Sequence, residues 1–183
     1  MKVDLGWLLL ILLVVAWIVW RLTALAGRID RLHHRIELSR ATLDAQLLRR
    51  ARAVEAVATS GLIDPASSIV LAQAASHSRN ADPADPVEHS VAESELSRDL
   101  REVFSDPDAI AGLRASPEGQ ELLDDLGSAC TQVALARRFL NDGVQAARLL
   151  RSGRLVRWFR LAGYAPQPAT MEMDDEPPQL LVL

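Results

Sequence analysis

The hydrophobic positions of the chain are concentrated first in one uncharged stretch near the N-terminus. Residues 5–20 have the sequence LGWLLLILLVVAWIVW and lie between Asp4 and Arg21. A helix over this stretch would cover about 24 Å at ~1.5 Å per residue. That is slightly less than a hydrocarbon core of ~30 Å, so the small and apolar residues up to Ala26 are needed to complete a crossing. The pattern predicts a transmembrane helix, and we assign residues 1–26 to a membrane anchor.

Aromatic and basic residues mark the two ends of the predicted span. Trp7 lies towards its start, and Trp17 and Trp20 lie towards its end, where amphipathic rings favour the membrane interface. The long stem of Arg21 can reach the headgroups from a slightly buried position. The alternative is a cleaved signal peptide, because residues 24–26 have the small-x-small form of a cleavage site. The span is favoured because Arg21 interrupts the approach to that site.

Beyond the anchor, the hydrophobic spacing is helical. Apolar residues recur every three or four positions from Leu22 to Ala58, and again from about residue 118 to 152, which predicts two long amphipathic helices. Two shorter helices are expected at 64–79 and 88–104. A capping residue followed by proline, which starts a helix, stands at Asp64-Pro65, Ser105-Asp106-Pro107 and Ser116-Pro117.

The predicted fold is all-α, with an N-terminal transmembrane helix that continues into an elongated antiparallel helical bundle. We assign residues 27–164 to the bundle. Residues 165–183 are acidic and rich in proline, a composition that predicts a disordered tail.

Composition agrees with close-packed helices, because hydrophobic residues make up 49% of the chain and aromatic residues only 4%. Charge is unevenly distributed: residues 80–128 are strongly acidic, and residues 21–52 and 129–164 are basic. Complementary segments of this kind favour an antiparallel bundle. A nucleic-acid surface is disfavoured, since the arginines before Trp158 lack interleaved aromatics and no reader motif occurs. Eight arginines in residues 21–52 favour a cytoplasmic location for the bulk of the chain.

The sequence contains no catalytic or metal-binding pattern, so we predict neither an enzyme nor a cofactor. His33 and His34 are adjacent, and on a helix they point about 100° apart, which prevents chelation of one ion in the i, i+4 manner. The single cysteine, Cys130, cannot form an internal disulfide. Nucleophile elbows and Gly-rich phosphate loops are absent.

A basic and aromatic segment follows the last long helix. Arg154, Arg157 and Arg160 recur at every third position around Trp158 and Phe159, a composition typical of helices at membrane surfaces. We predict that Arg157 and Trp158 contact the membrane interface. A short helix that caps the end of the bundle is the alternative.

Two stretches of the long helices resemble the LemA family. Residues 43–50, LDAQLLRR, are similar to the family's IDVQLKRR stretch, and residues 133–144, VALARRFLNDGV, are similar to its IAxARxxYNDAV stretch. The end of the chain from Leu155 to Tyr164 is also similar. This sequence departs from the family in having Glu55-Ala56 in place of Pro-Asn and Leu140 in place of Tyr, as a divergent member would. The resemblance implies a membrane-anchored antiparallel helical bundle, and it brings no established reaction or ligand.

The polar residues of these two stretches are candidate contacts between helices or with a partner. They are Asp44, Arg49, Arg50, Arg137, Arg138, Asn141 and Asp142. An ion pair between Asp142 and Arg49 would be an example.

We therefore expect a single-pass protein of the cell membrane that acts as a binding or scaffolding module. Its expected partners are the lipid bilayer and an unknown membrane-associated protein, with homo-oligomerisation possible and nucleic acid excluded. The alternatives are a non-catalytic regulatory subunit of a membrane enzyme and an exported helical bundle of the envelope.

Overall fold

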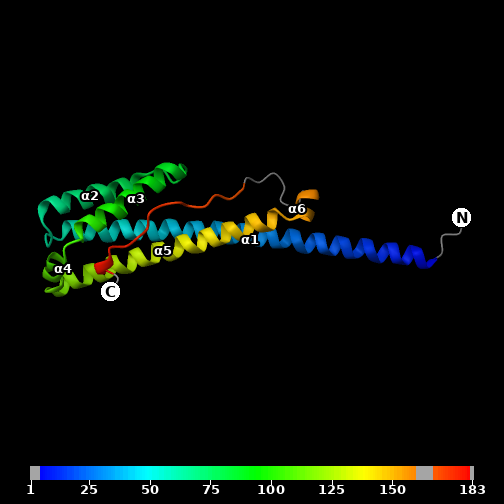
Figure 1. Cartoon of the computed structure of the whole chain (residues 1–183), viewed down its shortest axis with the longest axis horizontal. Helices are drawn as coiled ribbons and strands as arrows, with labels where there is room; N and C mark the ends of the chain where they lie inside the picture. Colours follow the sequence, from blue (N-terminus) through cyan, green and yellow to red (C-terminus); the bar gives the residue numbers. More distant parts are fainter. Residues whose placement is uncertain (1–4, 160–166, 182–183) are drawn as a thin grey trace. The chain divides into compact units, whose positions relative to one another are not determined.

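The protein is all-helical, as its sequence predicts. A computed structural model describes residues 5–159 and 167–181, and no strand occurs in these ranges. The elements, shown in Figure 1, are α1 (Leu5–Thr59), α2 (Pro65–Asn80), α3 (Pro86–Val103), α4 (Pro107–Arg114), α5 (Pro117–Arg151), α6 (Arg154–Trp158) and the short 3-10 helix η1 (Gln179–Leu181).

Aspartates followed by proline start three of these helices. The Oδ1 atom of Asp64 accepts hydrogen bonds from two backbone amides at the start of α2, both at 3.0 Å. Asp85 does the same for α3 at 2.9 and 3.1 Å, and Asp106 caps α4 at 3.0 Å. Each cap stabilises its helix by about 1 kcal/mol. α3 starts at Pro86, slightly before the predicted residue 88, because Asp85-Pro86 is itself a start signal.

The chain divides into two compact units. The first unit comprises Met1–Leu38 and Asp142–Ala169, and the second comprises Ser39–Asn141 and Thr170–Leu183. α1 and α5 each begin in one unit and end in the other.

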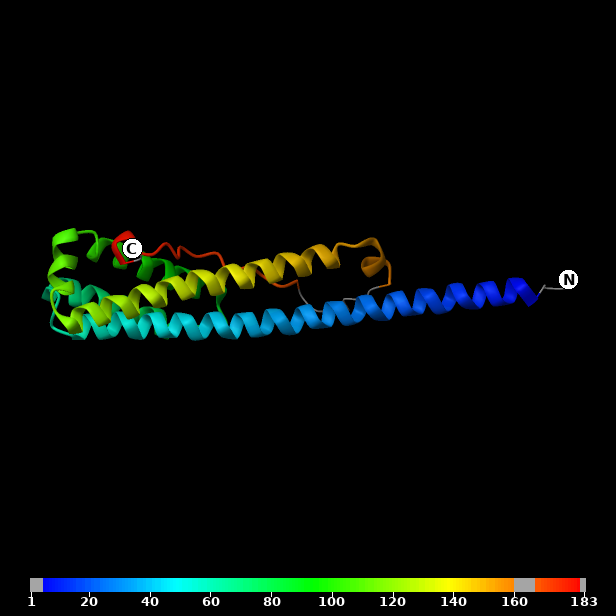
Figure 2. The same cartoon turned by 90° about the horizontal axis from the view of Figure 1, so that it is seen from below.

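The second unit contains the main hydrophobic core. Leu71 of α2, Leu100 of α3 and Leu126 of α5 are at most 1% exposed, and they pack with residues of α1 and α4. Small residues fill much of the remaining space, as the low aromatic content predicts, and Phe104 is the one aromatic residue of this cluster. α2 and α3 pack against each other, and Figures 1 and 2 show the first half of α5 lying along the end of α1.

The first unit has a smaller packed region. Its buried residues are Ile29 and Ile36 of α1, Val144 and Ala147 of α5, and Val156 of α6. A β-carbon at Gly143 would lie 3.5 Å from the Cγ1 atom of Ile36, so this glycine marks a close approach of α5 to α1.

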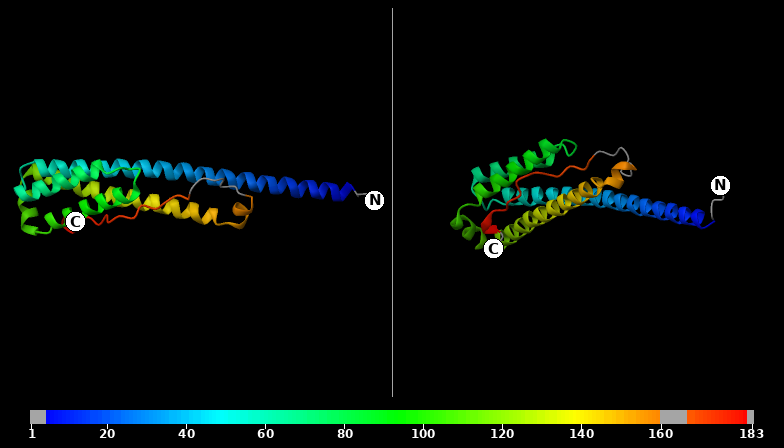
Figure 3. Two further views of the ribbon diagram at one scale, coloured as in Figure 1. Left: turned by 90° about the horizontal axis from the view of Figure 1, so that it is seen from above. Right: turned by 45° about the vertical axis from the view of Figure 1, so that its right-hand side comes forward.

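The tail differs from its prediction. Residues 167–181 were expected to be disordered, but residues 170–181 run over the helices of the second unit and end in η1 (Figure 3). Met173 and Leu181 are buried, at 9% and 8% exposure, and Leu181 belongs to the main core. The acidic, proline-rich composition suggested disorder, but the apolar residues spaced among the acids supply buried anchors. Residues 165, 166, 182 and 183 lie outside the described residues.

Candidate functional site

The first candidate site is the apolar end of α1. Every side chain from Gly6 to Arg21 is exposed, and the predicted interface residues Trp7, Trp17 and Trp20 are 63%, 60% and 64% exposed. A helix that is apolar on all sides is typical of the core of a large protein or of a membrane span. By length and composition, this is the one candidate for a membrane span in the described part of the chain.

A hydroxyl near this end is satisfied within the helix. The Oγ1 atom of Thr23 donates to the carbonyl oxygens of Val19 and Trp20, each at 2.9 Å. A satisfied hydroxyl costs much less in hydrocarbon than an unpaired one. The hydrogen-bonding pattern is therefore compatible with an extension of the span past Arg21.

α6 exposes the two other predicted interface residues. Trp158 is 81% exposed and its ring lies 5.6 Å from that of Phe159, while Arg157 is also exposed and Val156 is buried. One side chain of α6 thus packs inward while the aromatic pair stays accessible. Contact of Arg157 and Trp158 with a membrane stays a prediction, and residues 160–164 of the predicted segment lie outside the described residues.

The second candidate site is built around Arg50, one of the candidate contact residues predicted in the stretch 43–50. Arg49 Nη2 lies 2.6 Å from Asp125 Oδ1, so the suggested pairing of Arg49 with Asp142 is wrong. Asp44, Arg138 and Asp142 are exposed. Arg50, by contrast, is only 1% exposed.

Arg50 is the centre of a buried polar cluster. Its guanidinium donates to Glu93 Oε2 at 2.5 Å, to Ser97 Oγ at 3.0 Å and to the Glu93 carbonyl oxygen at 3.2 Å. Ser78 Oγ donates to Glu93 Oε1 at 2.5 Å, and His89 Nε2 lies 3.8 Å from the same oxygen. The cluster joins α1, α2 and α3. Its two charged side chains, Arg50 and Glu93, are each about 1% exposed.

This cluster is suited to holding helices together rather than to chemistry. A buried pair of this kind is costly to desolvate and costly to break, since removal of one partner leaves an unpaired charge. Glu93 and Ser97 were not among the residues predicted from the sequence. Their spacing of four residues beside Ala92 and Leu96 was the available signal, because it places both next to the apolar stripe of α3.

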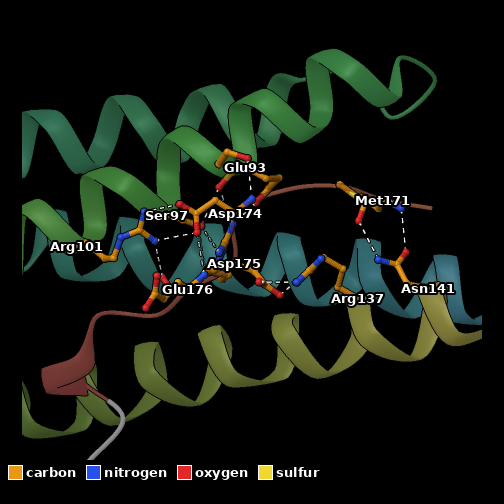
Figure 4. A network of polar contacts seen from close by, with 11 residues as sticks. Glu93, Ser97, Arg101, Arg137, Asn141, Met171, Asp174, Asp175 and Glu176 are labelled. Carbon is orange, nitrogen blue, oxygen red and sulfur yellow. Dashed lines mark hydrogen bonds and ion pairs between the residues drawn. The ribbon is translucent and has the colours of Figure 1, made fainter. Parts of the chain in front are cut away.

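The third candidate site holds the C-terminal segment, which we define as Thr170–Leu181. Among the side chains that hydrogen-bond to it are four of α3 and α5, which we call the clamp; Figure 4 labels three of them, Arg101, Arg137 and Asn141. The four clamp residues are Ser94 and Arg101 of α3, and Arg137 and Asn141 of α5.

Asn141 of the clamp binds the backbone of the segment. Its Nδ2 atom donates to the carbonyl oxygen of Met171 at 3.1 Å, and its Oδ1 atom accepts from the Met171 amide at 3.0 Å. Ser94 Oγ accepts from the Asp174 amide at 3.0 Å, and Arg101 donates to the Glu176 carbonyl oxygen at 2.8 Å. These contacts hold an extended main chain without regard to its side chains.

The two arginines of the clamp bind two successive carboxylates. Arg137 donates through Nε and Nη2 to the two oxygens of Asp175 at 2.7 and 2.8 Å. Arg101 holds both oxygens of Asp174 through Nη1, at 3.0 Å, and Nη2. The hydrogen bond to Asp174 raises the pKa of Arg101, that to Asp175 raises the pKa of Arg137, and the hydrogen bond from Arg101 lowers the pKa of Asp174.

Further contacts hold the last residues of the segment, beyond the clamp. Pro178 and Leu181 are buried, and Arg114 of α4 donates to the Leu180 carbonyl oxygen at 2.9 Å. A β-carbon at Gly127 of α5 would lie 2.6 Å from the carbonyl oxygen of Leu181, so only glycine permits this approach. A pocket of about 240 Å³ lies beside the segment, lined by Arg101, Phe104, Ser105, Glu176, Pro178, Gln179 and Leu180.

Two observations bear on candidate chemistry in the described part of the chain. No group of three or more potential metal ligands occurs among the described residues. Cys130 is 2% exposed, and burial raises the pKa of its thiol, which disfavours the reactive thiolate. The side chains gathered at the clamp are suited to binding.

Comparison with known protein families, characterised proteins and solved structures finds no match to this chain. Membership of the LemA family therefore stays a prediction, based on residues 43–50 and 133–144.

Proposed function

We propose that this protein is a single-pass, membrane-anchored helical bundle that acts as a binding or scaffolding module at the cell membrane and catalyses no reaction of its own. The exposed, apolar end of α1 carries the proposal, since such a surface is stable in a bilayer and unstable in water. The LemA-like stretches support it, because that family implies the same architecture. The clamp supplies a polar surface of a kind suited to protein recognition.

The proposed topology places the bulk of the chain in the cytoplasm. The arginines that follow the span, beginning at Arg21 and Arg28, are the reason, because positive residues are retained on the cytoplasmic side. The proposed partners are the bilayer and a membrane-associated protein, with a second copy of the chain as a further candidate.

Membrane insertion is tested by extraction of isolated membranes at alkaline pH. We expect the full chain to stay in the membrane pellet, as an integral protein does. A matched variant in which Leu9, Val14 and Ile18 are replaced by Asp should appear in the supernatant, because charges within a span oppose insertion. Release of the wild-type chain would contradict the proposal.

Sidedness and partner binding need separate measurements. Protease added to intact cells should leave the helices of the second unit undigested, and digestion would instead indicate the exported bundle. Capture from membranes in mild detergent should recover a reproducible protein partner. Recovery of an enzyme whose activity depends on this chain would favour a regulatory subunit over a scaffold.

A further inference from the structure

We propose that the clamp is a binding site for an extended, acidic segment of a partner protein, and that Thr170–Leu181 is a resident ligand which occupies it within the same chain. The inference deepens the proposed binding function and rests on it. It names the surface that binds and the chemistry that the surface selects.

The clamp binds a main chain. The amide of Asn141 pairs with both the N–H and the C=O of Met171, as a neighbouring β-strand would. Ser94 and Arg101 bind further backbone groups at Asp174 and Glu176. Recognition of an extended peptide through its backbone does not depend on which protein supplies it.

The clamp also selects acidic side chains. In an extended chain, successive side chains point to opposite sides, so Asp174 reaches Arg101 on α3 and Asp175 reaches Arg137 on α5. Both guanidinium groups bind their carboxylates through two nitrogens, which lysine could not reproduce. The preferred ligand therefore carries two consecutive carboxylates.

Burial alternates along the segment. Met171, Met173 and Asp175 are more buried than their neighbours Glu172 and Asp174. An apolar residue just before the acidic pair, where Met173 lies, therefore forms part of the recognised pattern.

A pocket beside the last residues of the segment leaves space for a different ligand. The pocket of about 240 Å³ lined by Pro178 and Leu180 is not filled by the resident segment. A partner with a bulkier side chain at this position would gain contacts that the chain's own segment lacks.

The contacts between the clamp and the resident segment are exposed enough for a partner's segment to replace them. The side chains of Arg101 and Asp174 are 29% and 40% exposed, so water and salt weaken their attraction. The tether within one chain compensates, because covalent linkage raises the effective concentration of the segment at the clamp. A free peptide at micromolar concentration should therefore compete poorly with the intact segment.

The test uses the full chain in detergent micelles and a fluorescent synthetic peptide of residues 169–181, ATMEMDDEPPQLL. The resident segment is weakened by Asp174→Asn/Asp175→Asn, which leaves the clamp intact. Fluorescence anisotropy should then show at least tenfold tighter peptide binding to this variant than to the wild type. The matched control Glu121→Gln/Asp124→Asn removes two exposed carboxylates of α5 and should behave as the wild type does.

Specificity is tested with the clamp itself. Addition of Arg137→Gln to the Asp174→Asn/Asp175→Asn variant should reduce peptide binding at least tenfold, with the helical circular dichroism unchanged. A peptide with both aspartates replaced by asparagine should also bind at least tenfold more weakly. Equal binding with and without Arg137, or no peptide binding to the opened variant, would overturn the proposal.

The same samples show whether a second copy of this chain, and not a partner protein, occupies the clamp. Light scattering should show that the Asp174→Asn/Asp175→Asn variant and the wild type have the same mass. Concentration-dependent association of the wild type that is abolished by Arg137→Gln would make a second copy the occupant, and would overturn the assignment to a partner protein. None of these measurements depends on membrane insertion, so failure of the clamp and failure of the proposed anchor are distinguishable.

Discussion

Arginine–carboxylate pairs occur in two very different settings in the second unit. Arg50 and Glu93 are both about 1% exposed, while the side chains of Arg137 and Asp175 are 21% and 14% exposed. The buried pair joins α1 to α3, and the more accessible pair joins α5 to the C-terminal segment. The comparison teaches that burial, more than distance, decides whether such a pair holds the fold together or can be exchanged, since the two distances are 2.5 and 2.7 Å.

The comparison is tested most strongly at the buried pair. Glu93→Gln keeps the shape of the side chain but leaves the Arg50 charge without a counter-charge, which should lower the free energy of unfolding by about 3–5 kcal/mol. Denaturant unfolding of the full chain in detergent, followed by circular dichroism, measures the change. Glu121→Gln at an exposed position of α5 is the control and should change stability by less than about 0.5 kcal/mol. A small effect of Glu93→Gln would show that Arg50 finds water or another partner.

The second largest change in stability is expected at Gly127, where α5 packs against η1. Gly127→Ala should push η1 away, since the added carbon would lie 2.6 Å from the Leu181 carbonyl oxygen. Loss of Leu181 burial costs about 1.5–3 kcal/mol, offset by about 0.5–1 kcal/mol of helix propensity. Gly112→Ala has open space around it and should stabilise slightly. Thermal unfolding of the two variants should therefore shift in opposite directions.

Removal of the accessible charges should have a small effect on global stability. We expect Asp174→Asn/Asp175→Asn to change the free energy of unfolding by less than about 2 kcal/mol in total, because each pair is partly exposed. The segment itself should become far more accessible to protease and to hydrogen exchange at Met171. A loss of stability as large as that of Glu93→Gln would contradict the distinction between the two settings.

Acid should release the segment before it unfolds the helices. The pKa of Asp174 is lowered by Arg101, so its contribution to holding the segment is complete above its ordinary value of 3.8 and is lost as the pH falls through the lowered pKa. The anisotropy of a fluorophore at the C-terminus should drop below about pH 4. The Asp174→Asn variant should lack this transition, and an unchanged transition would assign it to another group.

Much of the fold could be predicted from local sequence. The spacing of apolar residues gave α1 and α5 their extents, and Asp64-Pro65 gave the start of α2, because caps and prolines act within a few residues. Contacts between distant positions could not be predicted this way. Nothing near Arg50 in sequence indicates Glu93, which lies 43 residues away.

The tail shows why the candidate site was only half predicted. Arg137 and Asn141 were recognised as candidate contacts, yet their partners lie in a segment expected to be disordered. Its overall composition is that of a disordered chain. The alternation of Met171, Glu172, Met173 and Asp174 was the signal for an extended, half-buried segment, and it is too short to outweigh composition.

The two successive aspartates make the C-terminal segment sensitive to whether an insertion has an odd or an even number of residues. Asp174 faces α3 and Asp175 faces α5 because one residue step in an extended chain reverses the side to which a side chain points. One residue inserted between them would turn Asp175 away from Arg137, whereas two inserted residues would restore its direction. Many substitutions outside the two aspartates should therefore disturb the binding of this segment less than the insertion or deletion of a single residue.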